Sequence, residues 1–138
     1  MPVKDLDHVN LRTANLAGMI AFYEKVLGLT LGPRPAFGFD GAWLYCGERA
    51  TVHLIAVPQA AGIPDSGPAG LQLEHFAFTG EGLTDFMAQL RHHKVPYRPV
   101  EIQDFNIVQI NLHDVDGNHI HIDFAPEDGA DLSVYEGD

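Results

Sequence analysis

The sequence predicts an α+β protein made of two tandem βαβββ modules. Three observations support this prediction: short alternating segments typical of strands, two amphipathic segments typical of helices, and histidines that recur at about half the chain length of 138 residues. His8 and His75 are 67 residues apart, and His53 and His121 are 68 apart. Their neighbours are also alike, which indicates a duplicated module.

Module one, residues 5–57, is expected to begin with a strand in which polar and apolar side chains alternate. A helix should follow, with Asn15 as its N-cap and Gly28 at its C-terminal end. Three further strands complete the module. The expected elements are a strand at 6–13, a helix at 16–27 and strands at 29–31, 42–46 and 50–57.

A stretch rich in proline and glycine, residues 58–70, is expected to link the modules. Module two, residues 71–125, repeats the order of elements, with a hairpin turn at 116–118 before its last strand. The acidic tail, residues 126–138, is low in apolar content, and we expect it to be loosely held. The expected elements are a strand at 71–78, a helix at 82–93 and strands at 96–100, 106–113 and 119–124.

Alternation along these strands decides which side chains share a face. In the last strand, Ile120, Ile122 and Phe124 should pack beneath the helix of module two, so the alternate residues face the concave side. The same reasoning places four histidines on concave faces: His8, His53, His75 and His121. If a pseudo-twofold axis relates the modules, these imidazoles converge. Because neutral imidazole binds several divalent metals, their convergence would form a metal site.

Composition excludes several classes of function. The net charge is −11 and the chain has only eight lysines and arginines, which argues against binding to nucleic acid or to an anionic membrane surface. The single cysteine, Cys46, allows no disulfide within the chain and is expected to fill core space. Neither a signal peptide nor a membrane span is visible, so we expect a cytoplasmic protein.

Three motifs resemble those of the vicinal oxygen chelate superfamily, which includes glyoxalases, extradiol ring-cleaving dioxygenases, fosfomycin-modifying enzymes and bleomycin-binding proteins. They are Asp7-His8-Val9, the run AFYEKVLGL at 21–29 and the turn DVDGN at 114–118. The resemblance extends from Leu6 to Phe124. It implies the glyoxalase/bleomycin resistance/dioxygenase fold, in which paired modules form a cupped mixed sheet.

The resemblance also implies the ligand positions. Family metal ligands lie on the first and last strands of each module, which here carry His8, His53, His75 and His121. The family usually has glutamate at the position of His121 and an acidic residue at that of His53. Neutral ligands leave a divalent metal at its full charge, which favours an anionic chelating substrate. Nitrogen ligands suit Fe, Zn or Ni better than Mg or Ca.

Further side chains are candidates for the site. The catalytic candidates are His53, His121 and Tyr45, and the substrate-binding candidates are Arg34, Phe37, Phe39, Trp43, Gln109 and Asn111. The arginine would pair with an anion, and the two phenylalanines would stack on a ring. A plain hydrophobic turn explains that segment equally well, and sheet packing or an intersheet hydrogen bond explains the others. His113 and His119, beside the last hairpin, are expected at the surface, with an acid or base next to the metal ligands as the alternative role for one of them.

We therefore expect one divalent metal and an enzyme that acts on a small metal-chelating oxygen substrate, with a ring-cleavage dioxygenase ranked first. A glyoxalase-type lyase or isomerase is the first alternative, although it lacks the glutamate that moves the proton in that family. The second alternative is a small-molecule binding protein, for example for an antibiotic, that does no chemistry. Transfer of a thiol to an antibiotic epoxide is a further option. A homodimer is expected in each case.

Overall fold

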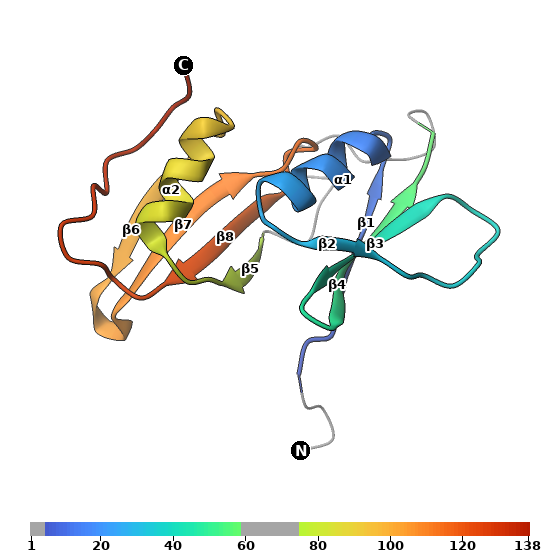
Figure 1. The fold of residues 1–138 in the computed structure, drawn as a ribbon, viewed down its shortest axis with the longest axis horizontal. Coiled ribbons are helices and arrows are strands. Elements are labelled where there is room, and N and C mark those ends of the chain that lie inside the picture. The colour runs from blue at the N-terminus through green and yellow to red at the C-terminus, as the bar shows by residue number, and fades with distance from the viewer. Residues whose placement is uncertain (1–4, 59–74) are drawn as a thin grey trace. The chain divides into compact units, whose positions relative to one another are not determined.

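The computed structural model describes residues 5–58 and 75–138. The chain divides into two compact units, residues 1–69 and 70–138. Each unit contains one α-helix and one four-stranded mixed sheet, so the predicted α+β class and the repeated module are confirmed (Figure 1). The expected linker, apart from its first residue, and the start of the strand expected at 71–78 lie outside the described residues.

Unit one has the element order predicted for module one. Its elements are β1 (Val9–Thr13), α1 (Leu16–Lys25), β2 (Thr30–Gly32), β3 (Gly41–Cys46) and β4 (Arg49–Ala56). The strands lie in the order β1-β4-β3-β2, with β1 parallel to β4 and the other pairs antiparallel. The first and fourth strands, which are distant in sequence, are therefore neighbours in the sheet.

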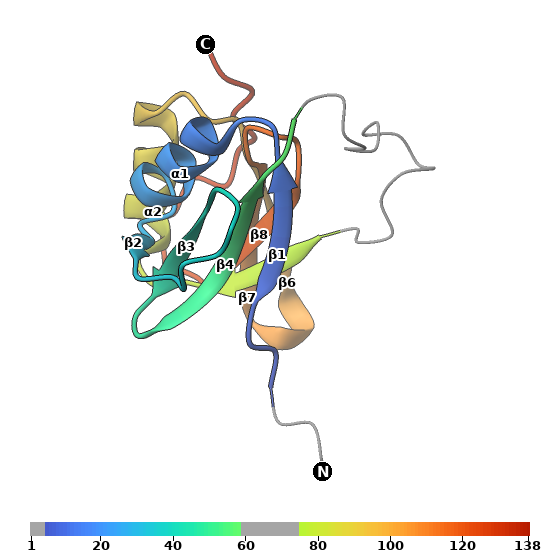
Figure 2. The ribbon, with the colours of Figure 1, turned by 90° about the vertical axis from the view of Figure 1, so that its right-hand side faces the viewer.

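Helix α1 begins at the predicted residue and ends at Lys25, two residues before the predicted end. The side chain of Asn15 accepts a hydrogen bond from the backbone N–H of Gly18 at 3.1 Å, which satisfies a donor at the helix N-terminus. Gly28 has a φ of +76°, a conformation that favours glycine after a helix end. The buried face of the helix covers one face of the sheet, as Figure 2 shows. Its buried residues are Met19, Phe22 and Tyr23.

Unit two repeats the arrangement. Its elements are β5 (Phe76–Thr79), α2 (Leu83–His92), β6 (Arg98–Ile102), the short 3-10 helix η1 (Gln103–Phe105), β7 (Ile107–His113) and β8 (His119–Phe124). The strand order is β5-β8-β7-β6, with β5 parallel to β8. Neither of the described α-helices is long and apolar enough to cross a bilayer.

The turn between β7 and β8 is held by one buried carboxylate. Asp114 accepts hydrogen bonds from the backbone N–H groups of Asp116 and Asn118, at 3.0 and 2.9 Å, and from the side-chain amide of Asn118 at 2.8 Å. Gly117 supplies the positive φ, +85°, that the turn requires. This turn sets the register of the two strands, and so it decides which of their side chains are neighbours.

The C-terminal segment is not loosely held, so that expectation was wrong. Glu127 accepts hydrogen bonds from the backbone N–H groups of Leu83 and Thr84, at 2.7 and 3.1 Å. It thereby caps α2, whose N-cap residue is a glycine without a side chain. Further along, the backbones of Tyr135 and Tyr97 exchange two hydrogen bonds. The acidic composition suggested a loosely held segment. Composition alone does not show that one carboxylate of the segment, that of Glu127, binds the N-terminus of α2.

Candidate functional site

In each unit, the parallel strand pair brings two predicted histidines together on the face of the sheet opposite the helix, here called the helix-free face. His8 precedes β1 and His53 lies on β4, and their ring centroids are 3.8 Å apart. His75 precedes β5 and His121 lies on β8, with centroids 4.6 Å apart. Each unit therefore holds one pair made of its first-strand and last-strand histidines, and the two pairs occupy equivalent places in the repeat.

In unit one the histidines belong to a stack of three rings. His53 lies between His8, at an interplanar angle of 9°, and Trp43, at 4.0 Å and 13°. Trp43 is the cross-strand neighbour of His53 on β3. The lone pair of an imidazole nitrogen lies in the ring plane, and nearly parallel planes do not meet at a nearby point. His8 and His53 therefore cannot bind the same metal ion without a rotation of at least one ring.

Hydrogen bonds orient both rings of this pair. The Nδ1 of His8 lies 2.7 Å from a carboxylate oxygen of Asp7, and the Nε2 of His53 lies 3.0 Å from the carbonyl oxygen of Ala50. Burial, followed by the charge of His8, lowers the pKa of His53, while the Ala50 carbonyl opposes this effect. The hydrogen bond with His8 lowers the pKa of Asp7. His53 is thus biased toward the neutral form that binds metals.

In unit two a carboxylate orients the buried histidine. The Nδ1 of His121 lies 2.7 Å from Oδ1 of Asp123, and both side chains are largely buried. The ring of His119 is also close, at 5.2 Å from His75 and 6.3 Å from His121. Two imidazoles on one metal at 90–110° have centroids about 4.5–5.2 Å apart, given metal–nitrogen distances of about 2.0–2.1 Å. The separation of His75 and His121 agrees with that arrangement.

The loop between β2 and β3 extends the stacked rings. Phe37 and Phe39 stack at 5.2 Å with an interplanar angle of 6°, and Phe37 lies 6.4 Å from Trp43. The guanidinium of Arg34 lies over both phenylalanine rings, at 4.9 and 5.3 Å, and donates to the carbonyl oxygen of Phe39. The four predicted substrate residues of unit one therefore form one cluster. The two phenylalanines are 44% and 47% exposed.

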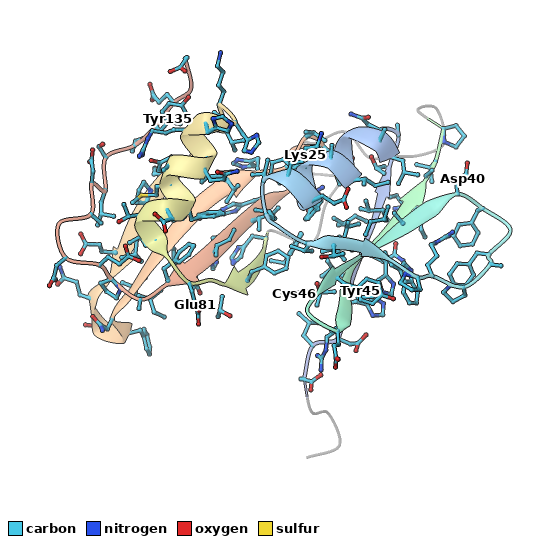
Figure 3. All side chains as sticks on the ribbon, in the orientation of Figure 1. Lys25, Asp40, Tyr45, Cys46, Glu81 and Tyr135 are labelled. Carbon is cyan, nitrogen blue, oxygen red and sulfur yellow. The ribbon has the colours of Figure 1, made fainter. Side chains whose placement is uncertain are left out.

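The remaining candidates already have hydrogen-bonding or pairing partners. The hydroxyl of Tyr45, labelled in Figure 3, donates to the carbonyl oxygen of Pro33 at 2.5 Å, so it holds the loop; its catalytic role stays a prediction. Asn111 bonds to groups on both neighbouring strands, within its own sheet. Gln109 lies opposite Asp123 in the pairing of β7 with β8. Gln109 and Asn111, the two candidates on β7, both lie on the helix-free face, as alternation along the strand predicts.

Sequence reasoning missed three contributors. Asp7 and Asp123 hold histidines, and alternation already placed Asp123 on the same face as His121. His119 was expected at the surface but is half-buried among the rings of unit two. Within residues 5–58 and 75–138, no three histidine, cysteine or acidic side chains are grouped closely enough to hold a metal ion. The ring separation of His75 and His121 suits two ligands of one metal, whereas the stack of His8 and His53 does not, and convergence of the two pairs stays a prediction.

A profile of the Glyoxalase/Bleomycin resistance protein/Dioxygenase superfamily matches residues 5–122. The chain therefore belongs to this superfamily. It is 28% identical over 120 residues to the Arabidopsis thaliana protein named Glyoxylase I 4. The aligned region covers 85% of this chain and 68% of that protein.

Solved structures share the fold at low identity. A glyoxylase/bleomycin resistance protein/dioxygenase domain from Frankia sp. EAN1pec has a TM-score of 0.72 at 16% identity, over 90% of this chain and 99% of that one. A lactoylglutathione lyase from Agrobacterium tumefaciens has a TM-score of 0.66 at 17% identity, over 94% and 100%. At this level of identity, the likeness concerns the fold alone.

Proposed function

We propose that this chain is a metal-dependent enzyme acting on a small substrate that chelates the metal through oxygen. One observation carries the proposal: His8, His53 and His121 each have one ring nitrogen engaged by a carboxylate or carbonyl oxygen. Metal-binding histidines almost always have such a partner, because it fixes the tautomer and directs the other nitrogen's lone pair toward the metal.

The donor set fits a divalent metal that prefers nitrogen, such as Fe, Zn or Ni. The residues that would hold it are His8, His53, His75 and His121. Bound there, the metal would supply Lewis acidity to a substrate oxygen. Coordination by both histidines of unit one requires their stack to open. A homodimer that completes or duplicates the site is part of the proposal.

The chain's own acid–base group in this proposal is His121, in a state in which the other histidines hold the metal and His121 has left it. Asp123 accepts the Nδ1 proton, so the neutral ring carries its lone pair on Nε2 and can accept a proton from substrate. Such a group could move a proton between adjacent carbons in the way that family glutamates do. His53, with its lowered pKa, is a second neutral imidazole suited to the same task. These groups favour a lyase or isomerase.

We therefore rank a glyoxalase-type lyase or isomerase above the dioxygenase that was ranked first from the sequence. The sequence relationship to the Arabidopsis protein named Glyoxylase I 4 supports this order. The dioxygenase has no support beyond the name of the superfamily. A binding protein without chemistry would have no need for the Asp123 carboxylate that holds the Nδ1 proton of His121.

Metal analysis of untagged protein, purified anaerobically, tests the proposal. We expect about one equivalent per site in the wild type and little in a His75→Ala/His121→Ala variant. A His92→Ala/His93→Ala variant is the matched control, because it removes two histidines at the end of α2. Absence of metal, even after reconstitution with Fe, Zn or Ni, would overturn the enzyme proposal and leave a binding protein.

Activity assays on the metal-loaded protein separate the reaction types. The hemithioacetal that glutathione forms with a 2-oxoaldehyde is the probe for lyase or isomerase chemistry, and catechols with dioxygen are the probe for ring cleavage. Formation of the thioester from the hemithioacetal that is lost in His121→Ala would support the lyase ranking. Oxygen consumption with a catechol on iron-loaded protein would reverse the ranking.

A further inference from the structure

The loop between β2 and β3 holds a half-buried cation, Arg34, that the proposed function does not use. Its guanidinium lies over the rings of Phe37 and Phe39, at 4.9 and 5.3 Å from their centroids. One guanidinium nitrogen, Nη2, donates to the carbonyl oxygen of Phe39 at 3.1 Å. The loop itself therefore fixes the position of the cation.

Arg34 lies on the helix-free face of unit one. A Cβ atom at Gly41 would lie 2.9 Å from Nη2 of Arg34, so the guanidinium packs against the start of β3 where glycine leaves room for it. Gly41 and Trp43 are two positions apart on this strand and share a face, and Trp43 stacks on His53. Phe37 lies 6.4 Å from Trp43. The cation and a proposed metal ligand therefore lie on one face, with aromatic rings between them.

Arg34 lacks the partner that a cation withdrawn from water needs. Its Nε is buried and has no hydrogen-bond partner, and no carboxylate of residues 5–58 and 75–138 forms an ion pair with it. Asp40, the acidic residue of the same loop, is labelled in Figure 3 and also forms no such pair. Buried charges are normally paired, because removing them from water is costly. An anionic group of a ligand would supply the partner.

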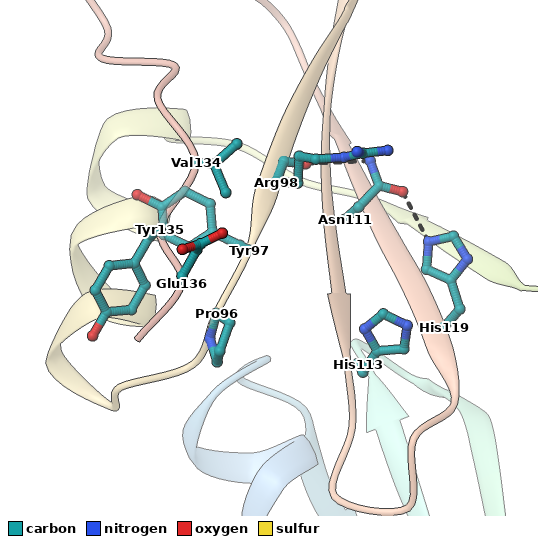
Figure 4. A pocket seen from close by; sticks show the side chains of 9 residues that line it. All are labelled: Pro96, Tyr97, Arg98, Asn111, His113, His119, Val134, Tyr135 and Glu136. Carbon is teal, nitrogen blue, oxygen red and sulfur yellow. Dashed lines mark hydrogen bonds between the residues drawn. The ribbon is translucent and has the colours of Figure 1, made fainter. Parts of the chain in front are cut away.

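The other arginines do not share this feature. All five arginines of the chain lie in the described residues, and the remaining four are exposed. Arg49, for example, pairs with Asp5 at 3.1 Å. Arg98 lines a cavity of about 470 Å³ in unit two, shown in Figure 4, but it is exposed and shares that lining with Glu136. Arg34 alone combines partial burial with the absence of a carboxylate partner in the described residues.

We propose that Arg34 selects substrates that carry a carboxylate, which it binds while the apolar part of the substrate covers Phe37 and Phe39. Guanidinium groups bind carboxylates through charge-assisted hydrogen bonds, and the two exposed rings supply apolar contact area. The substrate would then extend across Trp43 toward His53. That this acid is the substrate of the metal site rests on the proposed function, whereas its binding to Arg34 requires no metal.

Titration of metal-free full-length protein with benzoate tests the proposal, with benzyl alcohol as the uncharged probe of similar shape. The indole N–H resonance of Trp43, the single tryptophan, reports binding beside Phe37 in NMR spectra. We expect benzoate to shift it and to bind at least about tenfold more tightly than benzyl alcohol, because only benzoate carries the charge that pairs with arginine. No shift with benzoate, or equal binding of the two probes, would overturn the proposal. EDTA in the buffer makes this result independent of the metal analysis.

Substitutions separate the two parts of the site. Arg34→Gln should weaken benzoate binding about tenfold and leave the binding of benzyl alcohol unchanged. Phe37→Ala/Phe39→Ala should weaken the binding of both probes, because both use the rings. Arg98→Gln is the matched control, since it removes an exposed arginine in unit two, and it should bind benzoate like the wild type.

A folding defect cannot produce the expected pattern, because a misfolded Arg34→Gln variant would lose both probes. Wild-type affinity for benzoate in a folded Arg34→Gln variant would overturn the proposal. Should that variant not fold, the comparison of the two probes on the wild-type protein decides the question by itself.

Discussion

At the scale of single residues, the support that the Asp123 carboxylate gives to His121 as a metal ligand can be tested. Asp123→Asn should lower metal affinity about 10- to 100-fold, because the neutral amide is a weaker partner for the Nδ1 proton. Zinc competition with a chromophoric chelator measures the change. Asp128→Asn, in the C-terminal segment, is the matched control and should bind zinc like the wild type. Equal affinity in all three proteins would show that Asp123 does not support a metal ligand.

Trp43 provides a second readout at this scale, since it is the single tryptophan of the chain. Its ring stacks on His53, and that stack must open if both histidines of unit one bind one metal. We expect zinc to change the tryptophan emission intensity and EDTA to restore it. Zinc should leave the emission of a His53→Ala variant unchanged. An unchanged emission during stoichiometric zinc binding to the wild type would mean that unit one keeps its stack.

The lowered pKa of His53 makes stability depend on pH. The folded state binds this proton less readily than the unfolded state, whose pKa is near the ordinary value of 6.5. The stability of metal-free protein should therefore hold above pH 6.5 and fall as the pH drops below it. Urea unfolding at pH 7.5 and 5.5 measures the loss, which should be smaller in His53→Gln. A stability that increases on acidification from pH 7.5 to 5.5 would contradict the assignment.

At the scale of elements, the capping of α2 by Glu127 links the C-terminal segment to the second module. Glu127→Gln keeps the size of the side chain but removes the charge that interacts with the helix N-terminus. We expect faster amide exchange in the first turn of α2 and a lower Tm. Glu101→Gln, on β6, is the control for loss of an exposed carboxylate. Unchanged exchange at Leu83 and Thr84 would mean that the cap contributes nothing.

Most helices and strands could be predicted from the sequence, because the interactions that begin and end them join residues close together in the chain. The N-cap at Asn15, the glycine at position 28 and the alternation along β8 depend on neighbours within a few residues. The partner of the α2 N-terminus could not be predicted in this way. Glu127 lies 44 residues from Leu83, and one acidic residue in an acidic tail looks like any other.

At the scale of the whole molecule, the proposal that both units hold one metal has a direct test. If all four histidines share it, His8→Ala/His53→Ala and His75→Ala/His121→Ala should each weaken zinc binding by more than about 100-fold. If one unit holds the metal alone, only one of the two variants should lose it. Calorimetric titration of both variants and the wild type decides between these outcomes.

The sequence by itself determined the duplicated module, the superfamily and the face of each sheet that carries the histidines, because strand alternation and repeat spacing are properties of the chain. Only the tertiary structure decided how those histidines are oriented and which groups they contact. The stack of His8, His53 and Trp43 and the pairing of His121 with Asp123 depend on strand register and ring rotation. These follow from contacts between segments distant in sequence, and a pattern of residue types does not encode them locally.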